Sequence, residues 1–137
     1  MLDPKMINPQ FTEALSEKWI NYALNHSEPI PEILTDLERE THQKILQPRM
    51  LSGPLQGRFL SLIAHLVCPK SIIEIGTFTG YATLCLAEGL QEKGVIHTLD
   101  INEELVPIQE RFFNKSAFRD QIKRHLGAAL DIIPKLS

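Results

Sequence analysis

One stretch, residues 71–82, constrains the fold of this chain more than any other. Residues 72–75 include three isoleucines, which are typical of a central parallel strand buried on both faces. Gly76 and Gly80 allow a tight turn after that strand, and apolar residues spaced through 81–90 predict a helix. This order predicts an α/β fold with a ligand beside the turn, because a helix start offers unpaired N–H groups and a partial positive charge.

The spacing of the turn residues narrows the class of ligand. Glu74, Gly76 and Gly80 form the pattern Glu-x-Gly-x-x-x-Gly, which is neither the Gly-x-Gly-x-x-Gly of dinucleotide sites nor a Gly-x-x-x-x-Gly-Lys-Ser/Thr phosphate loop. A second apolar run, 95–99, is followed by Asp100, where an acid would accept hydrogen bonds from a ribose diol. Alternatively, Asp100 is a turn residue that starts the next helix. The glycine turn and the acid together favour an adenosine-containing ligand.

Four segments resemble the successive motifs of one enzyme family. Residues 50–57, 74–81, 98–102 and 127–134 are similar to those of the S-adenosylmethionine-dependent O-methyltransferases of the caffeoyl-CoA and catechol type. The resemblance spans residues 30–137 in the expected order. It implies a Rossmann-like class I methyltransferase fold, of which this chain would hold only the N-terminal part, with helices and the first three parallel strands.

The resemblance also implies a cofactor site for S-adenosylmethionine. Its residues would be Met50, Ser52, Glu74, Gly76, Phe78, Gly80, Tyr81, Ala82, Asp100, Ile101, Ala128 and Ala129. Glu74 would orient the amino end of the methionine moiety and Asp100 would hold the ribose. Ile101 and residues 128–130 would lie beside the adenine. Ala82 stands where the family often has a hydroxyl residue, so we expect a modest loss of affinity.

The catalytic half of such a site is not found in this sequence. In the family, the metal ligands and the base follow the fourth and fifth strands, whereas this sequence ends at Ser137. We therefore assign no catalytic residue and no metal ligand, and we expect a divalent cation, usually magnesium, only in a longer form. The family strand order, 3-2-1-4-5-7-6, would leave residues 72–75 as an exposed apolar edge. We expect the chain either to self-associate through this edge, as a homodimer, or to be a fragment of a longer protein.

Composition and charge exclude several classes of partner. The formal net charge of -3 gives no basic surface for nucleic acid. No apolar signal core or membrane-spanning run is present, so we expect no membrane association. Cys68 and Cys85 are too few for a disulfide framework, and we expect both to be buried thiols in a reducing cytoplasm.

The remaining patterns predict a single domain, 1–137, with N-terminal helices over 1–68 and the cofactor-binding part over 69–137. Trp19 and Tyr22, on a predicted helix over 11–25, are expected to pack in the core; the alternative is a contact with a substrate or a dimer partner. The other expected features are a helix from Pro31 through Leu46, a helix with one apolar face over 55–66, a helix end at 92–94, an N-cap at Asn102, a helix distorted near Pro107, an edge strand over 122–126 and a cap at Asp131.

Three functional hypotheses follow. The first is an O-methyltransferase that transfers a methyl group to a hydroxyl of a small catechol-like or caffeoyl-type aromatic acceptor. The second is a non-catalytic module that binds S-adenosylmethionine or a partner. The third is a nucleotide-dependent oxidoreductase.

Overall fold

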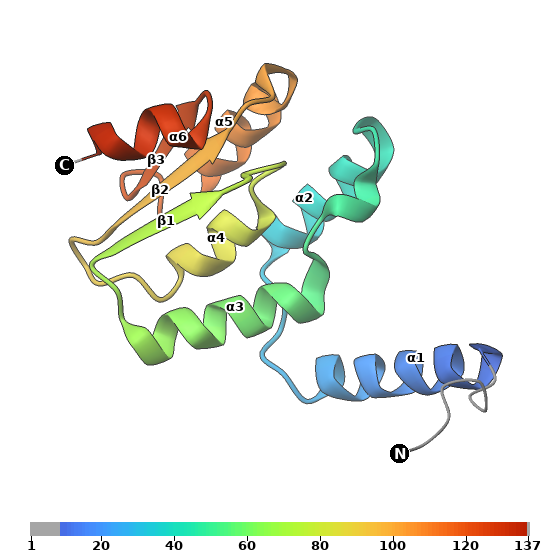
Figure 1. Ribbon diagram of the computed structural model, residues 1–137. Helices are drawn as coiled ribbons and strands as arrows, with labels where there is room; N and C mark the ends of the chain where they lie inside the picture. The colour runs from blue at the N-terminus through green and yellow to red at the C-terminus, as the bar shows by residue number, and fades with distance from the viewer. Residues whose placement is uncertain (1–8, 137) are drawn as a thin grey trace, which may run out of the picture.

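A three-stranded parallel sheet forms the centre of the computed structural model, which describes residues 9–136, with side chains described from residue 17 (Figure 1). The strands are β1 (Ser71–Ile75), β2 (Val95–Asp100) and β3 (Ile122–Leu126), in the spatial order β1-β2-β3. Ile73 of β1 is opposite His97 of β2, and His97 is opposite Lys123 of β3. The prediction of an α/β fold with three parallel strands is confirmed.

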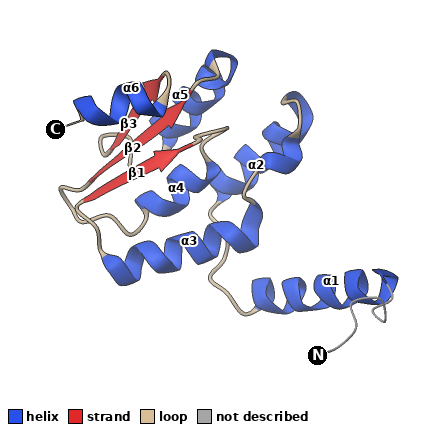
Figure 2. Cartoon of the chain, in the orientation of Figure 1, coloured by secondary structure: helices blue, strands red, loops and turns tan. Residues whose placement is uncertain are grey.

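Helices pack against the sheet without enclosing it, as Figure 2 shows, and alternate residues of β1 remain exposed. The helices are α1 (Pro9–Asn25), α2 (Glu32–Lys44), α3 (Gly53–Val67), α4 (Tyr81–Ala87), α5 (Val106–Lys115) and α6 (Ala129–Ile132). Short 3₁₀ turns cover Pro48–Met50, Glu103–Leu105 and Ile133–Lys135. The order strand, helix, strand, helix, strand is that of two βαβ units, which gives parallel strands their crossover connections.

One apolar cluster holds α2, α4 and α5 against the sheet. Leu37 of α2, Leu84 of α4, Ile96 of β2 and Phe112 of α5 are all buried within it. The apolar stripe of α5 points inward because Ile108 and Phe112 lie one turn apart. This cluster joins the N-terminal helices to the strands and fixes the carboxyl ends of the strands where the glycine turn lies.

The free edge of β1 departs from one sequence-based expectation and confirms another. Ile73 is 49% exposed and Ile75 is 67% exposed, so β1 is not buried on both faces. Burial on both faces requires a second neighbouring strand and a covering layer, and β1 pairs only with β2 in the described chain. The expected exposed apolar edge is therefore present. The α3 helix is also apolar and exposed, at Leu55, Phe59, Leu62, Ile63, Leu66 and Val67. We call these residues, with Ile73 and Ile75, the α3–β1 surface.

The N-terminal helix also differs from expectation. Trp19 is 66% exposed and Tyr22 is 57% exposed, so their predicted core packing is wrong. Figure 1 shows α1 extending away from the sheet, and the rings of Trp19 and His26 lie against the ring of Tyr22. Cys68 was likewise expected to be buried and is exposed at the end of α3, whereas Cys85 is buried as expected.

The structure also tests the predicted helix boundaries. Pro107 lies in the first turn of α5, where it removes no helical hydrogen bond, and the turn before it, Glu103–Leu105, is 3₁₀, so the expected irregularity near the first turn is present in this form. The helix after the glycine turn ends at Ala87 rather than near Gly94. Asp131 lies inside α6 and caps no helix, since Ala128 occupies the N-cap position. The predicted N-cap at Asn102 is confirmed, because its side chain accepts a hydrogen bond from Glu104 N.

The contact between α3 and the end of α4 yields a stability prediction. A Cβ atom on Gly89 would lie 2.2 Å from the carbonyl carbon of Ala64 and 2.3 Å from His65 N. Because both are backbone atoms of α3, a rotamer change cannot relieve the clash. We expect Gly89→Ala to lower the free energy of unfolding by about 1–3 kcal/mol, measured by urea denaturation followed by circular dichroism. Glu92→Ala, at an exposed neighbouring position, is the control, and an unchanged midpoint for Gly89→Ala would contradict the packing described.

Candidate functional site

A glycine turn connects β1 to α4. Gly76 N and Thr77 N donate hydrogen bonds to Leu99 O, at 2.8 and 3.2 Å, so the turn is bound to the end of β2. The backbone of Gly76 has a φ of +94°, and the space that a Cβ would occupy there is open. The positive φ explains the glycine. The open space allows a ligand to reach the backbone closely.

Asp100, at the end of β2, fixes this turn through hydrogen bonds to the backbone. Its Oδ2 accepts a hydrogen bond from Phe78 N at 2.7 Å, and its Oδ1 accepts one from Asn102 N at 2.9 Å. Phe78 is in the left-handed region, with a φ of +49°, which is strained for a residue with a side chain. Gln109 Nε2 of α5 donates to Phe78 O at 2.6 Å, so both polar groups of this strained residue are fixed.

Glu74, the last polar residue of β1, presents a second carboxylate at the same turn. Its Oε2 accepts hydrogen bonds from Thr83 Oγ1 and Thr98 Oγ1, each at 2.5 Å. Burial raises the pKa of Glu74 above its ordinary value, and the charge of Asp100 raises it further, whereas the two threonine hydroxyls oppose the rise. An acid in this setting suits a cationic ligand group, since a nearby positive charge would favour its ionised form.

Two of the residues expected at the cofactor site also pack in the core. A Cβ on Gly80 would lie 2.4 Å from Cε1 of Phe113, so Gly80 is needed for close contact with α5. Tyr81 is only 2% exposed, and its ring, like the thiol of Cys85, lies against Gly57 of α3. The Tyr81 side chain is therefore turned into the core. Ala82 is half-buried in the first turn of α4, a helix too short to give a strong dipole.

The hydroxyl of Tyr81 differs from most buried polar groups, which have a hydrogen-bond partner. It is buried and has no hydrogen-bond partner among the described residues, and burial raises the pKa of this phenol. Because an unsatisfied buried hydroxyl costs free energy, we expect Tyr81→Phe to leave the free energy of unfolding unchanged or to raise it by about 1–2 kcal/mol. Urea denaturation measures the effect, with Tyr22→Phe at an exposed position as the control. Destabilisation by Tyr81→Phe would show that the hydroxyl has a partner.

The remaining proposed residues lie on loops that follow the strands or precede α3. Ile101 is 77% exposed directly after Asp100, so its side chain is free to contact a ligand. Ala128 and Ala129 follow β3 and begin α6. Met50 is exposed and Ser52 is half-buried in the segment between α2 and α3, which Figure 1 shows at the same end of the molecule as the β1–α4 turn.

Sequence reasoning missed Gln109, Thr83 and Thr98. Each is fully or almost fully buried, at 1%, 0% and 0% exposure. Buried polar side chains need partners, and here their partners are the turn backbone and Glu74. The threonine at position 98 carried a weak signal, because a hydroxyl residue interrupts the apolar run just before Asp100.

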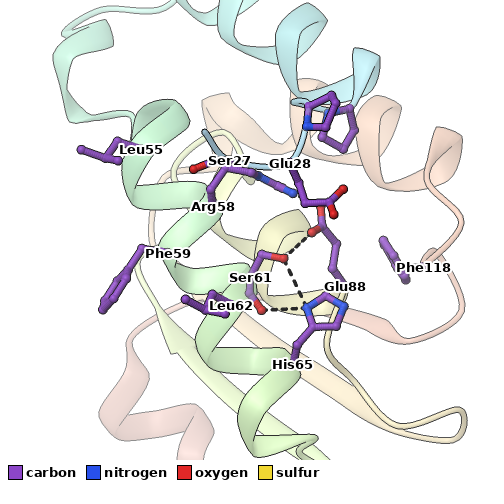
Figure 3. Close-up of a pocket in the computed structure, with 12 residues that line it drawn as sticks. Ser27, Glu28, Leu55, Arg58, Phe59, Ser61, Leu62, His65, Glu88 and Phe118 are labelled. Carbon is purple, nitrogen blue, oxygen red and sulfur yellow. Dashed lines mark hydrogen bonds and ion pairs between the residues drawn. The ribbon is translucent and has the colours of Figure 1, made fainter. Parts of the chain in front are cut away.

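A separate pocket of about 870 Å3 lies beside α3, away from this turn. Figure 3 shows Arg58, Ser61, His65 and Glu88 directed toward one another there. Arg58 Nη2 pairs with Glu88 Oε1 at 2.7 Å, and the Ser61 hydroxyl donates directly to Glu88 Oε2. Because no imidazole lies between this hydroxyl and the carboxylate, the group is not a catalytic triad. Its polar groups form hydrogen bonds with one another, and we interpret the network as structural.

Within the part of the chain that the structure describes, no cluster of three or more His, Cys, Asp or Glu side chains could hold a metal ion. Over the same residues, no helix has the length and apolarity required to span a bilayer.

Comparisons with known proteins show which sequences and folds this chain resembles. A catechol O-methyltransferase of Niastella koreensis is 33% identical over 89 residues, covering 65% of this chain and 40% of that protein. Caffeoyl-CoA O-methyltransferase 2 of Petunia hybrida is 33% identical over 106 residues, covering 77% of this chain and 43% of that protein. The crystal structure of the SAH-bound methyltransferase PaMTH1 of Podospora anserina matches 100% of this chain and 56% of that chain, with a TM-score of 0.83 and 25% identity.

The parallel sheet, glycine turn and paired acids define an α/β protein of the Rossmann-like methyltransferase class. The O-methyltransferase family model matches residues 24–137, and the chain belongs to that family. It spans about half the length of the relatives that it matches.

Proposed function

We propose that this chain binds S-adenosylmethionine at the β1–α4 turn. The single observation that carries the proposal is the convergence of two carboxylates, Glu74 and Asp100, on a turn whose Gly76 has open space around it. The Glu74 carboxylate would receive the amino group of the methionine moiety. Asp100 retains lone pairs for the ribose hydroxyls after accepting two backbone N–H groups. The SAH-bound methyltransferase that matches the whole chain supports this cofactor.

Several residues would complete the cofactor site. Ile101 is exposed beside Asp100 and would pack on the adenine with Ala128 and Ala129. Phe78 and Gly76 would line the turn, and the Ala82 backbone would lie near the carboxylate group. The segment with Met50 and Ser52 would border the methionine end. Gly80 and Tyr81 would act through the backbone, because their other contacts are in the core.

The activity proposed for the protein is transfer of a methyl group to a hydroxyl of a small catechol-like or caffeoyl-type acceptor. The names of its relatives support this acceptor class. Bound S-adenosylmethionine would supply the methyl group, and the chain would position it. No catalytic residue is assigned, and a divalent cation, magnesium in the first instance, is proposed only for a longer form that carries its ligands.

Calorimetric titration of the chain tests the proposed cofactor. We expect S-adenosylhomocysteine to bind with 1:1 stoichiometry and NAD to give no heat of binding. Magnesium is expected to leave the affinity for S-adenosylhomocysteine unchanged. Binding of NAD alone would favour the oxidoreductase hypothesis, and binding of neither nucleotide would refute the proposed function.

A non-catalytic module is the second candidate. The observation that favours it is the lack of a three-ligand metal cluster among residues 9–136. Incubation with labelled S-adenosylmethionine, magnesium and a catechol would distinguish the two. A methylated product supports the transferase, whereas cofactor binding without product supports the module.

A homodimer formed through the α3–β1 surface is proposed for the isolated chain. The side chains of this surface are apolar and at least 40% exposed, and their burial between two copies would favour association. Two β1 strands related by a two-fold axis can pair antiparallel, so each copy would cover the open edge of the other.

The organisation and location of the chain are proposals as well. We propose one domain over 1–137, with helices in 1–68 and the cofactor part in 69–137, because α2 shares its buried cluster with α4, α5 and β2. A cytoplasmic location is supported by two free cysteines, Cys68 and Cys85.

A further inference from the structure

Three buried threonine hydroxyls lie close together at the β1–α4 turn. Thr77, Thr83 and Thr98 are 3%, 0% and 0% exposed, and they come from the turn, α4 and β2. Thr77 Oγ1 and Thr98 Oγ1 are 2.6 Å apart, and Thr98 Oγ1 in turn donates to Glu74 Oε2. Since Thr98 has one proton and gives it to Glu74, Thr77 donates to Thr98. The hydroxyls thus form a directed chain that ends on the carboxylate.

The two oxygens of Glu74 are therefore not equivalent. Oε2 accepts from both Thr83 and Thr98, whereas Oε1 has no hydrogen-bond partner among the described residues. Oε1 is also not among the described buried polar atoms that lack a partner, so solvent reaches it. One oxygen is anchored by two hydroxyls and the other is accessible to solvent.

We propose that Thr83 and Thr98 are positioning residues, which fix the Glu74 carboxylate so that Oε1 receives the α-amino group of the cofactor. This inference rests on the proposed function. Neither threonine touches the ligand in this arrangement, so neither is a catalytic residue. Because the two hydroxyls already hold the Glu74 rotamer in the free protein, less conformational entropy is lost when the ligand binds.

The network also sets the acid limit of binding. Glu74 must be ionised to pair with an ammonium group, so affinity is lost as the pH falls through its pKa. The groups that act on Glu74 are Asp100 of β2, which raises its pKa as a like charge, and the hydroxyls of Thr83 and Thr98, which lower it. Removal of one hydroxyl therefore moves the loss of affinity to a higher pH.

Isothermal titration with S-adenosylhomocysteine between pH 5 and 8 tests the inference. For Thr98→Val, which keeps the side-chain volume, we expect the acid-side midpoint of the affinity profile to rise by about one pH unit. Thr83→Val should shift it in the same direction, and Thr98→Ser should restore the profile of the unaltered chain. Thr41→Val is the matched control, because Thr41 is equally buried but bonds Leu37 O and Thr79.

The outcomes separate the two proposals. If the unaltered chain binds S-adenosylhomocysteine but both valine variants keep its pH profile, the positioning role is refuted and the proposed function stands. If the unaltered chain does not bind, the proposed function and this inference both fail. A weaker affinity without a shift in the acid-side midpoint would indicate a merely structural role and would also overturn the inference.

Discussion

Asp100→Asn is expected to weaken binding of S-adenosylhomocysteine by at least about tenfold. The Asp100 carboxylate accepts Phe78 N and Asn102 N while keeping lone pairs for a diol, whereas an amide offers one acceptor oxygen in place of two. Hydrogen bonds to a charged group contribute about 1.5–3 kcal/mol each. The substitution is therefore expected to weaken both the bonds to the turn backbone and the bonds to the ligand. Calorimetry gives the affinity, and urea denaturation gives the accompanying loss of stability.

Asp120→Asn is the matched control for this variant. Its side chain is 89% exposed and makes only an exposed ion pair with Arg119, so neither affinity nor stability should change. Unchanged affinity in Asp100→Asn would contradict the ribose role and leave Asp100 as a residue of the turn alone.

The double substitution Ile73→Lys/Ile75→Lys is expected to convert the isolated chain from a dimer to a monomer. Both side chains lie exposed on the open edge strand, so the variant should fold normally. Lysines there would be desolvated without partners in any pairing of two edges. We expect the dimer dissociation constant to rise at least about tenfold, measured by sedimentation equilibrium.

Leu46→Lys provides the control for self-association. Leu46 is 87% exposed between α2 and α3 and is not part of the α3–β1 surface. This variant should remain dimeric and thereby exclude a general effect of replacing an exposed apolar residue with a cation. A monodisperse monomer for the unaltered chain at micromolar concentrations would refute the homodimer.

Local patterns predicted the strands and the glycine turn, because these depend on nearby residues. The strand Ile122–Leu126 and the position of Asp100 at the end of β2 follow from short apolar runs and their boundaries. The exposure of Trp19 and Ile73 could not be predicted in this way, since burial depends on which surfaces meet in three dimensions. An amphipathic pattern indicates that a face needs a partner but does not supply one.

The polar contacts of the candidate site were harder to anticipate. Gln109 occupies an inward position on α5 that an amphipathic pattern assigns to an apolar residue, and only the backbone of Phe78 explains its amide. Thr83 resembles an ordinary helix residue until Glu74 is placed opposite it. When a side chain forms its hydrogen bonds with another segment, the sequence pattern around it does not predict that role.

The bond from Gln109 to Phe78 joins the middle of α5 to the mouth of the turn. Because the amide is buried and Phe78 is strained, a small displacement of α5 would be transmitted directly to the backbone beneath the ligand. Substitutions along the outer side of α5, remote from any bound molecule, would then register as changes in residence time. If the cofactor binds as proposed, α5 would couple the far side of the protein to the lifetime of the complex.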